Sequence, residues 1–221
     1  MPGQLLKWLS CGAVSGAILC AAPVTAAPAA AQKLVYVAHH SRYGTIGTLT
    51  NIITRDGDET DVDTEVRIAV SFLGITAFRQ NASRQEHWKG GRLLSFHGVT
   101  TTNGNSVELN GSAREDHFVL QKPNGETVVA PANVKLANPW SAAALHGDSI
   151  FTPDRGRLDD VMVTTGSAKI EIGDKPVHVT RYDVYLRDGE KKYEVDVDDG
   201  GTVDQFAVYN PGGTITFSLR G

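Results

Sequence analysis

GITAFRQNASRQEHWKGGRLLSFHGVTTTNG, residues 74–104, consists of two long runs on either side of a glycine pair. Gly90 and Gly91 supply the positive φ angles that a two-residue hairpin turn requires. The stretch therefore predicts a long β-hairpin in which Trp88 and Leu93 are paired beside the turn.

A two-residue turn also fixes the register of this hairpin. It places Glu86 opposite Ser95, and it places Arg84 opposite His97. The resulting face holds apolar and ionisable side chains: Phe78, Ala82, Arg84, Glu86, Trp88, Leu93, His97 and Val99. Such a face is either a ligand cavity or a strip of charges near an exposed edge, because buried charges must be paired.

Alternation with period two continues along the chain. In residues 61–70 the even positions hold Val, Thr or Ile and the charged residues are at odd positions, which is typical of a strand with one buried face. Turn dipeptides separate such runs: Asp56-Gly57, Asn103-Gly104, Asn124-Gly125, Asp188-Gly189, Asp199-Gly200 and Gly212-Gly213. This recurrence predicts an all-β fold, a long antiparallel meander of about fourteen strands. A sheet of that size is expected to curl into an open or spiral barrel.

One segment departs from the alternation and predicts a short helix near residues 139–146. Asn138 is a suitable N-cap, Pro139 suits the first helical position, and Gly147 can end the helix. Trp140 of this segment either plugs the open end of the curled sheet or packs under a loop.

Residues 1–31 have the features of an export signal. Lys7 precedes an apolar run from Trp8 to Ala22, and small residues continue to Ala31. The run is too short for a spanning helix, so an uncleaved membrane anchor is the less favoured alternative. We therefore expect a cleavable signal at 1–31, a single β domain at 32–221, and a periplasmic mature protein without a transmembrane span.

Both cysteines, Cys11 and Cys20, lie in this leader, so the mature chain has no disulfide and no cysteine ligand for a metal. The leader contains one lysine and no acidic residue, which leaves about 20 basic against 25 acidic residues and a net charge of about −5. This balance argues against general nucleic-acid binding, which needs a basic surface.

The sequence contains no G-x-S-x-G elbow, no H-E-x-x-H and no phosphate-binding P-loop. His87 and His97 would face opposite sides in the register above, so a shared metal is not expected unless a β-bulge shifts that register. Glu86, His97 and Arg84 form a candidate acid/base group, but a nucleophile or metal to complete it is missing. We therefore expect no metal and no cofactor, and an enzyme is the less favoured reading.

Short motifs spread over the chain are YGTIG at 43–47, FR at 78–79, EHWKGGRL at 86–93, TNG at 102–104, NPW at 138–140 and RY at 181–182. In these motifs the chain resembles the exported bacterial domain-of-unknown-function family numbered six-one-three-four. The family has no assigned activity, so the resemblance implies a compartment and a fold rather than a mechanism. It is similar to envelope proteins, lipoprotein carriers among them, whose long antiparallel sheet curls into an open or spiral barrel.

These observations favour a non-enzymatic periplasmic binding, carrier or scaffolding module for an apolar or lipid-like ligand or an envelope protein. The residues expected to line its site are Phe78, Trp88, Leu93, Val99 and Trp140. One alternative is an envelope-polysaccharide hydrolase or lyase that uses Glu86, His97 and Arg84. Another is a structural envelope-integrity protein that docks partners by its sheet edges.

Overall fold

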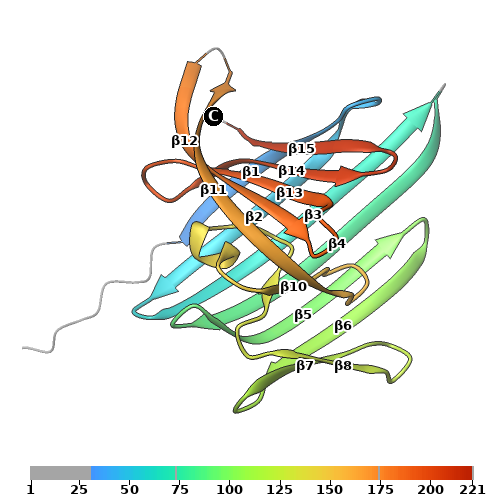
Figure 1. Cartoon of the computed structure of the whole chain (residues 1–221). Coiled ribbons are helices and arrows are strands. Elements are labelled where there is room, and N and C mark those ends of the chain that lie inside the picture. The colour runs from blue at the N-terminus through green and yellow to red at the C-terminus, as the bar shows by residue number, and fades with distance from the viewer. Residues whose placement is uncertain (1–30, 73, 174, 221) are drawn as a thin grey trace, which may run out of the picture.

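The computed structural model describes residues 31–72, 74–173 and 175–220, so the expected leader lies outside it except for Ala31. The described residues form one sheet of fifteen strands (Figure 1). The strands are β1 (Ala31–His40), β2 (Gly44–Asp56), β3 (Glu59–Phe72), β4 (Ile75–Lys89), β5 (Arg92–Thr102), β6 (Asn105–Ala113), β7 (His117–Gln121), β8 (Thr127–Pro131), β9 (Lys135–Leu136), β10 (Ser149–Phe151), β11 (Leu158–Ile172), β12 (Lys175–Leu186), β13 (Lys191–Val197), β14 (Val203–Asn210) and β15 (Gly213–Leu219).

The order of the strands confirms the predicted meander. Strands that follow one another in sequence are paired, with the exception of β8 and β9, which form the two edges of the sheet. In addition, β1 pairs with β15 as well as with β2, which joins the two halves of the chain. The β9–β10 pair is parallel, whereas β1–β15 and the hairpin pairs are antiparallel. Because β8 and β9 do not pair with each other, the sheet is open rather than closed into a barrel.

Burial follows the alternation that the sequence predicts. In β3 the side chains of Val62, Thr64, Val66 and Ile68 are buried, and the charged side chains between them are exposed. The even positions of β3 therefore form part of one continuous inner face of the curled sheet.

The predicted turn of the β4–β5 hairpin is present. Gly90 and Gly91 have φ angles of 55° and 77°, which side chains other than glycine rarely adopt. Trp88 pairs with Leu93 beside this turn, as expected.

An extra residue, Leu94, forms a β-bulge directly after this first pair. The next paired positions are His87 and Ser95, which leaves Leu94 without a partner on β4. Glu86 therefore lies opposite Phe96. The predicted register, which placed Glu86 opposite Ser95, is wrong by one residue.

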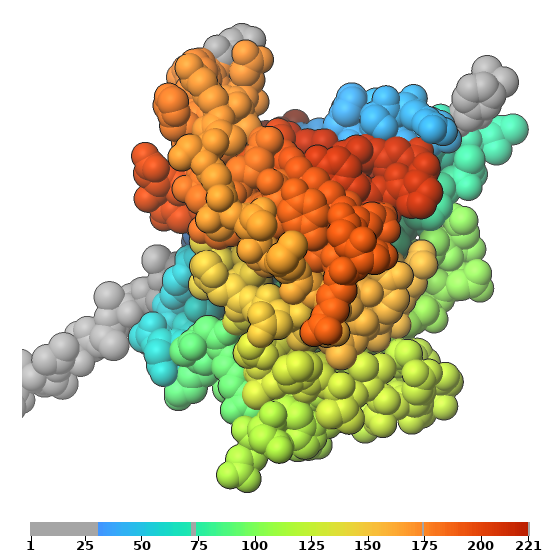
Figure 2. Space-filling model, in the orientation of Figure 1, coloured from blue at the N-terminus to red at the C-terminus, as the bar shows by residue number. Residues whose placement is uncertain are grey.

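The segment that contains β9, β10 and the 3₁₀ helix η1 (Ala142–Leu145) lies inside the curl, between β13–β15 and β5–β8 (Figure 1). In the space-filling view this yellow segment is packed between the orange-red and green parts of the molecule (Figure 2). The ring of Phe151 on β10 lies 5.2 Å from that of Phe96 and 6.0 Å from that of Phe118. One end of the sheet thus packs onto the inner face of its other end, which makes the fold spiral.

The helix expected near 139–146 is shorter than predicted. It is a single 3₁₀ turn whose N-cap is Ser141, without a side-chain capping bond. Asn138 does not cap it, because the helix begins further along the chain, at Ala142. The amide nitrogen of Asn138 donates to buried side chains of the sheet.

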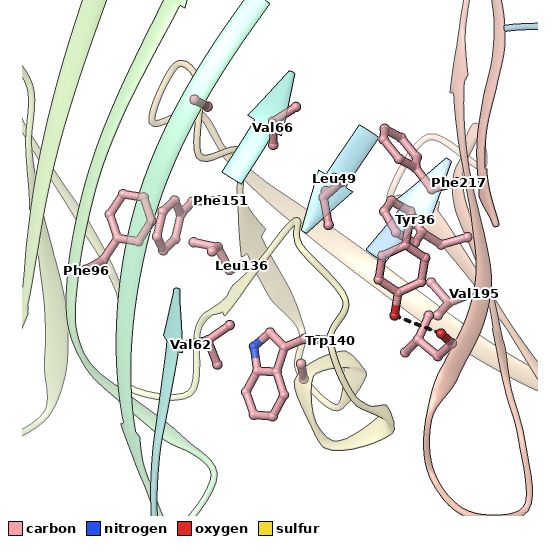
Figure 3. Packing of buried hydrophobic residues seen from close by; sticks show 14 of the residues in the cluster. Tyr36, Leu49, Val62, Val66, Phe96, Leu136, Trp140, Phe151, Val195 and Phe217 are labelled. Carbon is pink, nitrogen blue, oxygen red and sulfur yellow. Dashed lines mark hydrogen bonds between the residues drawn. The ribbon is translucent and has the colours of Figure 1, made fainter. Parts of the chain in front are cut away.

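Buried apolar side chains from both ends of the chain meet in one core (Figure 3). Phe206 and Phe217 stack with ring centroids 4.5 Å apart, and Tyr36 packs edge-on against Phe206. Tyr36 Oη donates to the backbone oxygen of Val203 at 2.8 Å. This contact holds the start of β14 against β1, so the first and the penultimate strands are joined by a bond outside the backbone ladder.

Candidate functional site

The carboxylate of Glu86 is buried in the interior, with only 2% of the residue exposed. The alternation of β4 turns Glu86 inward together with Arg84 and Trp88. Glu86 Oε2 accepts hydrogen bonds from Trp88 Nε1 at 2.9 Å and from Trp140 Nε1 at 3.0 Å. Glu86 Oε1 accepts one from Asn138 Nδ2 at 3.0 Å. Three N–H donors thus satisfy one buried carboxylate, as buried polar groups require.

The network continues from Asn138 across the sheet. Asn138 Nδ2 also donates to Thr64 Oγ1 at 3.0 Å, and Thr64 Oγ1 donates to Asn51 Oδ1 at 2.8 Å. All three side chains are buried. The network therefore fixes the segment between β9 and η1 to β2, β3 and β4.

Opposing effects act on the pKa of Glu86. Burial raises it, and this effect outweighs the N–H bonds from Asn138, Trp88 and Trp140 and the charge of Arg84, which lower it. Glu86 therefore holds its proton more readily than an exposed glutamate does.

The two indoles complete a wall across the interior. The rings of Trp88 and Trp140 pack edge to face, with centroids 5.8 Å apart and planes at 68°. We name the group Glu86, Trp88, Asn138 and Trp140 the tryptophan partition. Its residues line two cavities, one toward each end of the curled sheet.

The larger cavity has a volume of about 660 Å³ and is walled by β2, β3, β4, β14 and β15. It reaches the end of the sheet that carries the β1–β2 and β3–β4 turns, where His40 and Phe78 line it. Its walls are largely apolar and include Leu49, Val66, Val70, Phe78, Phe206 and Phe217. Its volume is within the range of about 300–1,000 Å³ typical of small-molecule sites.

Arg84 is a buried cation at this cavity. Its exposure is 7%, and its Nε has no hydrogen-bond partner among the described residues. Burial lowers the pKa of its guanidinium, whereas Asp154 and Glu86 raise it through their charge alone. Asn138, which also lines the cavity and is buried, has an Oδ1 atom without a partner among the described residues. The cavity therefore combines apolar walls with one buried cation and one buried amide oxygen that are not fully satisfied.

The smaller cavity, of about 350 Å³, is on the other side of the tryptophan partition. It is lined by Trp88, Trp140 and the alanines of η1, and it reaches Gly91 and Gly201 in turns at the opposite end of the sheet. In the antiparallel meander, the β3–β4 and β4–β5 turns must lie at opposite ends. The two cavities therefore open in opposite directions.

The sequence profile of one family, described as a domain of unknown function (DUF6134), matches residues 42–220. The chain belongs to this family. The resemblance that the YGTIG, EHWKGGRL and NPW motifs indicate is thereby confirmed. No activity comes with the DUF6134 assignment.

Among solved structures, the DUF6134 chain is similar to the beta-barrel-like protein of domain of unknown function DUF1849 from Brucella abortus. The TM-score is 0.62 at 9% sequence identity, over 88% of this chain and 98% of that chain. At this identity the likeness concerns the fold alone, and it supports the open, curled all-β architecture. No curated protein matches the chain.

The structure distributes the predicted site residues of the DUF6134 domain over different places. Phe78 lines the larger cavity, and Trp88 and Trp140 line the smaller one. Leu93 is fully buried in the packed core. Val99, expected beside them, pairs with the exposed Ser83 and lies on the outer face, because the bulge shifts the later part of β5 by one position.

The candidate acid/base group is not assembled. Arg84 and Glu86 face inward, but His97 pairs with the exposed Gln85 and is on the outer face. There His97 Nδ1 lies 2.8 Å from Asn110 Oδ1. The prediction that the three groups share one face is wrong for His97, for the same reason as for Val99.

The bulge also brings His87 and His97 to the same outer face, contrary to the prediction for a regular hairpin. His87 Nδ1 contacts Asp61 Oδ1 at 2.7 Å. Within residues 31–72, 74–173 and 175–220, no group of three or more His, Cys, Asp or Glu side chains is placed to hold a metal ion. No helix of these residues has the length and apolar character needed to span a membrane.

Three members of the polar network were missed as site residues. Thr64 was visible as a polar residue at a buried position of the 61–70 run. Asn51 carried no comparable signal, and Asn138 was interpreted as a helix cap. Their association depends on the packing of residue 138 against β3, which local sequence patterns do not encode.

Proposed function

We propose that this DUF6134 protein is a non-enzymatic binding or carrier module of the bacterial envelope, with an apolar or lipid-like guest in the larger cavity. The observation that carries the proposal is the cavity itself, about 660 Å³ with largely apolar walls. Contact between water and the apolar walls of a cavity has an unfavourable free energy, and an apolar ligand that replaces this water lowers the free energy. The cavity is therefore suited to an apolar guest.

The periplasmic location is part of this proposal and is supported by the sequence of residues 1–31. A charged start, an apolar run and small residues at its end are typical of a cleavable export signal. A carrier for lipid-like molecules in that compartment would shield them from water between membranes.

A hydrolase or lyase that uses Glu86, Arg84 and His97 is not favoured by the geometry. Both carboxylate oxygens of Glu86 accept hydrogen bonds from neighbouring side chains. His97 lies on the other face of the sheet, where it cannot exchange a proton with Glu86 directly.

Binding of the neutral fluorescent probe N-phenyl-1-naphthylamine tests the proposal. Val208, half-buried on β14, lines the cavity, so Val208→Trp should narrow it. Val129→Trp is the matched control, because Val129 is 62% exposed on the edge strand β8. We expect saturable binding to the wild type and Val129→Trp and at least about ten-fold weaker binding in Val208→Trp. A wild type that binds no probe, or equal binding by all three proteins, would contradict the proposal.

A further inference from the structure

Arg84 is at the deep end of the larger cavity. It lies on β4 six residues beyond Phe78, which lines the cavity nearer its open end. At about 3.3 Å per residue, the two positions are about 20 Å apart along the strand. A ligand whose head group reaches Arg84 would therefore have its chain beside the apolar wall for most of this distance.

The other cations that line the cavity differ from Arg84. Arg155 and Arg157 are exposed and lie beside Asp154 and Asp159, at 3.4 Å and 2.8 Å respectively. Lys192 is half-exposed, so water can solvate its ammonium. Among the described lining residues, Arg84 is thus the cation whose side chain is buried.

Two anionic groups face Arg84, and neither forms a hydrogen bond with it. Glu86 is held by the three donors of the tryptophan partition, and Asp154 lies beside Arg155. Both act on Arg84 through charge only. A buried guanidinium with an open N–H is unfavourable until an acceptor meets it.

We infer that the ligand is an acyl-chain amphiphile with a small anionic head group, a carboxylate or a phosphate, bound by Arg84 at the deep end of the cavity. This inference rests on the proposed function and specifies its ligand class. A guanidinium presents paired N–H groups in a plane, which matches the two oxygens of a carboxylate or phosphate. The chain extends from Arg84 along Val66 and Phe78 toward the open end.

Calorimetric titration with dodecanoate, dodecyl phosphate and neutral 1-dodecanol tests the inference. The variants are Arg84→Met, which removes the charge and keeps the stem, and Arg84→Lys, which keeps a charge. Arg67→Met is the matched control, because Arg67 is on the exposed face and pairs with Glu65. Near-ultraviolet circular dichroism verifies that each variant is folded.

We expect the wild type to bind one or both anions at least about ten-fold more tightly than dodecanol, as charge-assisted hydrogen bonds would give. The anion that is preferred identifies the head group. Arg84→Met should lose this preference and bind dodecanol within about two-fold of the wild type, whereas Arg84→Lys and Arg67→Met should retain a preference.

Equal affinity of the wild type for all three probes, or an unchanged preference in Arg84→Met, would overturn the role of Arg84 and leave the apolar cavity proposal intact. Absence of binding for all three probes, together with no binding of the neutral fluorophore, would overturn both proposals.

Discussion

At the scale of single residues, Glu86 is the acceptor on which the packing of the inner segment depends. Trp88, Trp140 and Asn138 all donate to it, and none of the three N–H groups can reach water easily in the buried interior. A buried donor that loses its acceptor costs about 1–3 kcal/mol. Glu86 is therefore better explained as a structural anchor than as a catalytic acid.

We predict that Glu86→Leu lowers the free energy of unfolding by about 3 kcal/mol or more, because it leaves three buried donors without an acceptor. Urea denaturation followed by tryptophan fluorescence measures this change. Glu171→Leu, on an exposed position of β11, should change the stability by less than about 0.5 kcal/mol. A Glu86→Leu variant as stable as the wild type would show that the network contributes nothing.

A second prediction concerns Gly111 on β6. A Cβ atom there would lie 2.5 Å from the ring of Phe118 and 3.2 Å from Cβ of Phe96. Gly111→Ala should therefore cost about 1–3 kcal/mol through overpacking. Gly166→Ala is the control, since a Cβ atom at Gly166 on β11 meets nothing within 4 Å. Equal thermal unfolding midpoints for the two variants would contradict the prediction.

At the scale of elements, the bulge at Leu94 determines which side chains of β5 face the interior. Sequence alternation identified the inward residues of β4 correctly, including Arg84, Glu86 and Trp88. It failed on β5 because the two-residue turn suggested a regular register. Phe96 fits inward because it lies over Gly98, where a Cβ atom would be 2.6 Å from its ring. That fit depends on tertiary packing, which periodicity alone does not reveal.

Deletion of Leu94 together with Ser95 is predicted to abolish the native fold. With Leu93 still opposite Trp88, the two-residue deletion would place Phe96 opposite His87, which turns Phe96 outward and His97 inward, so a core aromatic would be exchanged for an ionisable group. We expect loss of the near-ultraviolet dichroism signal and of cooperative unfolding. Deletion of Leu94 alone, which removes the bulge but keeps Ser95 opposite His87, should remain folded; a double-deletion variant that unfolds at the wild-type midpoint would refute this interpretation.

The segment around residue 140 shows a second limit of local patterns. Asn138 and Pro139 are good helix-start residues, and they predicted about two helical turns. In the structure, Asn138 and Trp140 instead bond to Glu86, and only Ala142–Leu145 remain helical. A strong buried acceptor outweighs a weak helical preference.

At the scale of the whole molecule, the sequence was sufficient to predict an open, curled all-β fold, because alternation and turn residues repeat along the chain. It could not predict that the β9 end would pack into the curl and divide the interior. This division creates two cavities that open in opposite directions, and the larger one contains Arg84. The function proposed for this DUF6134 domain follows from that division rather than from any local motif.

The most direct test of this account is a crystal structure with 12-bromododecanoate, in which bromine anomalous scattering locates the end of the chain. We predict a carboxylate within hydrogen-bonding distance of Arg84 Nε and a bromine peak in the larger cavity, on the side of its open end. A bromine peak in the cavity beside η1, a carboxylate bound at the rim by Arg155, or no ligand bound from either 12-bromododecanoate or 12-bromododecyl phosphate would contradict the account.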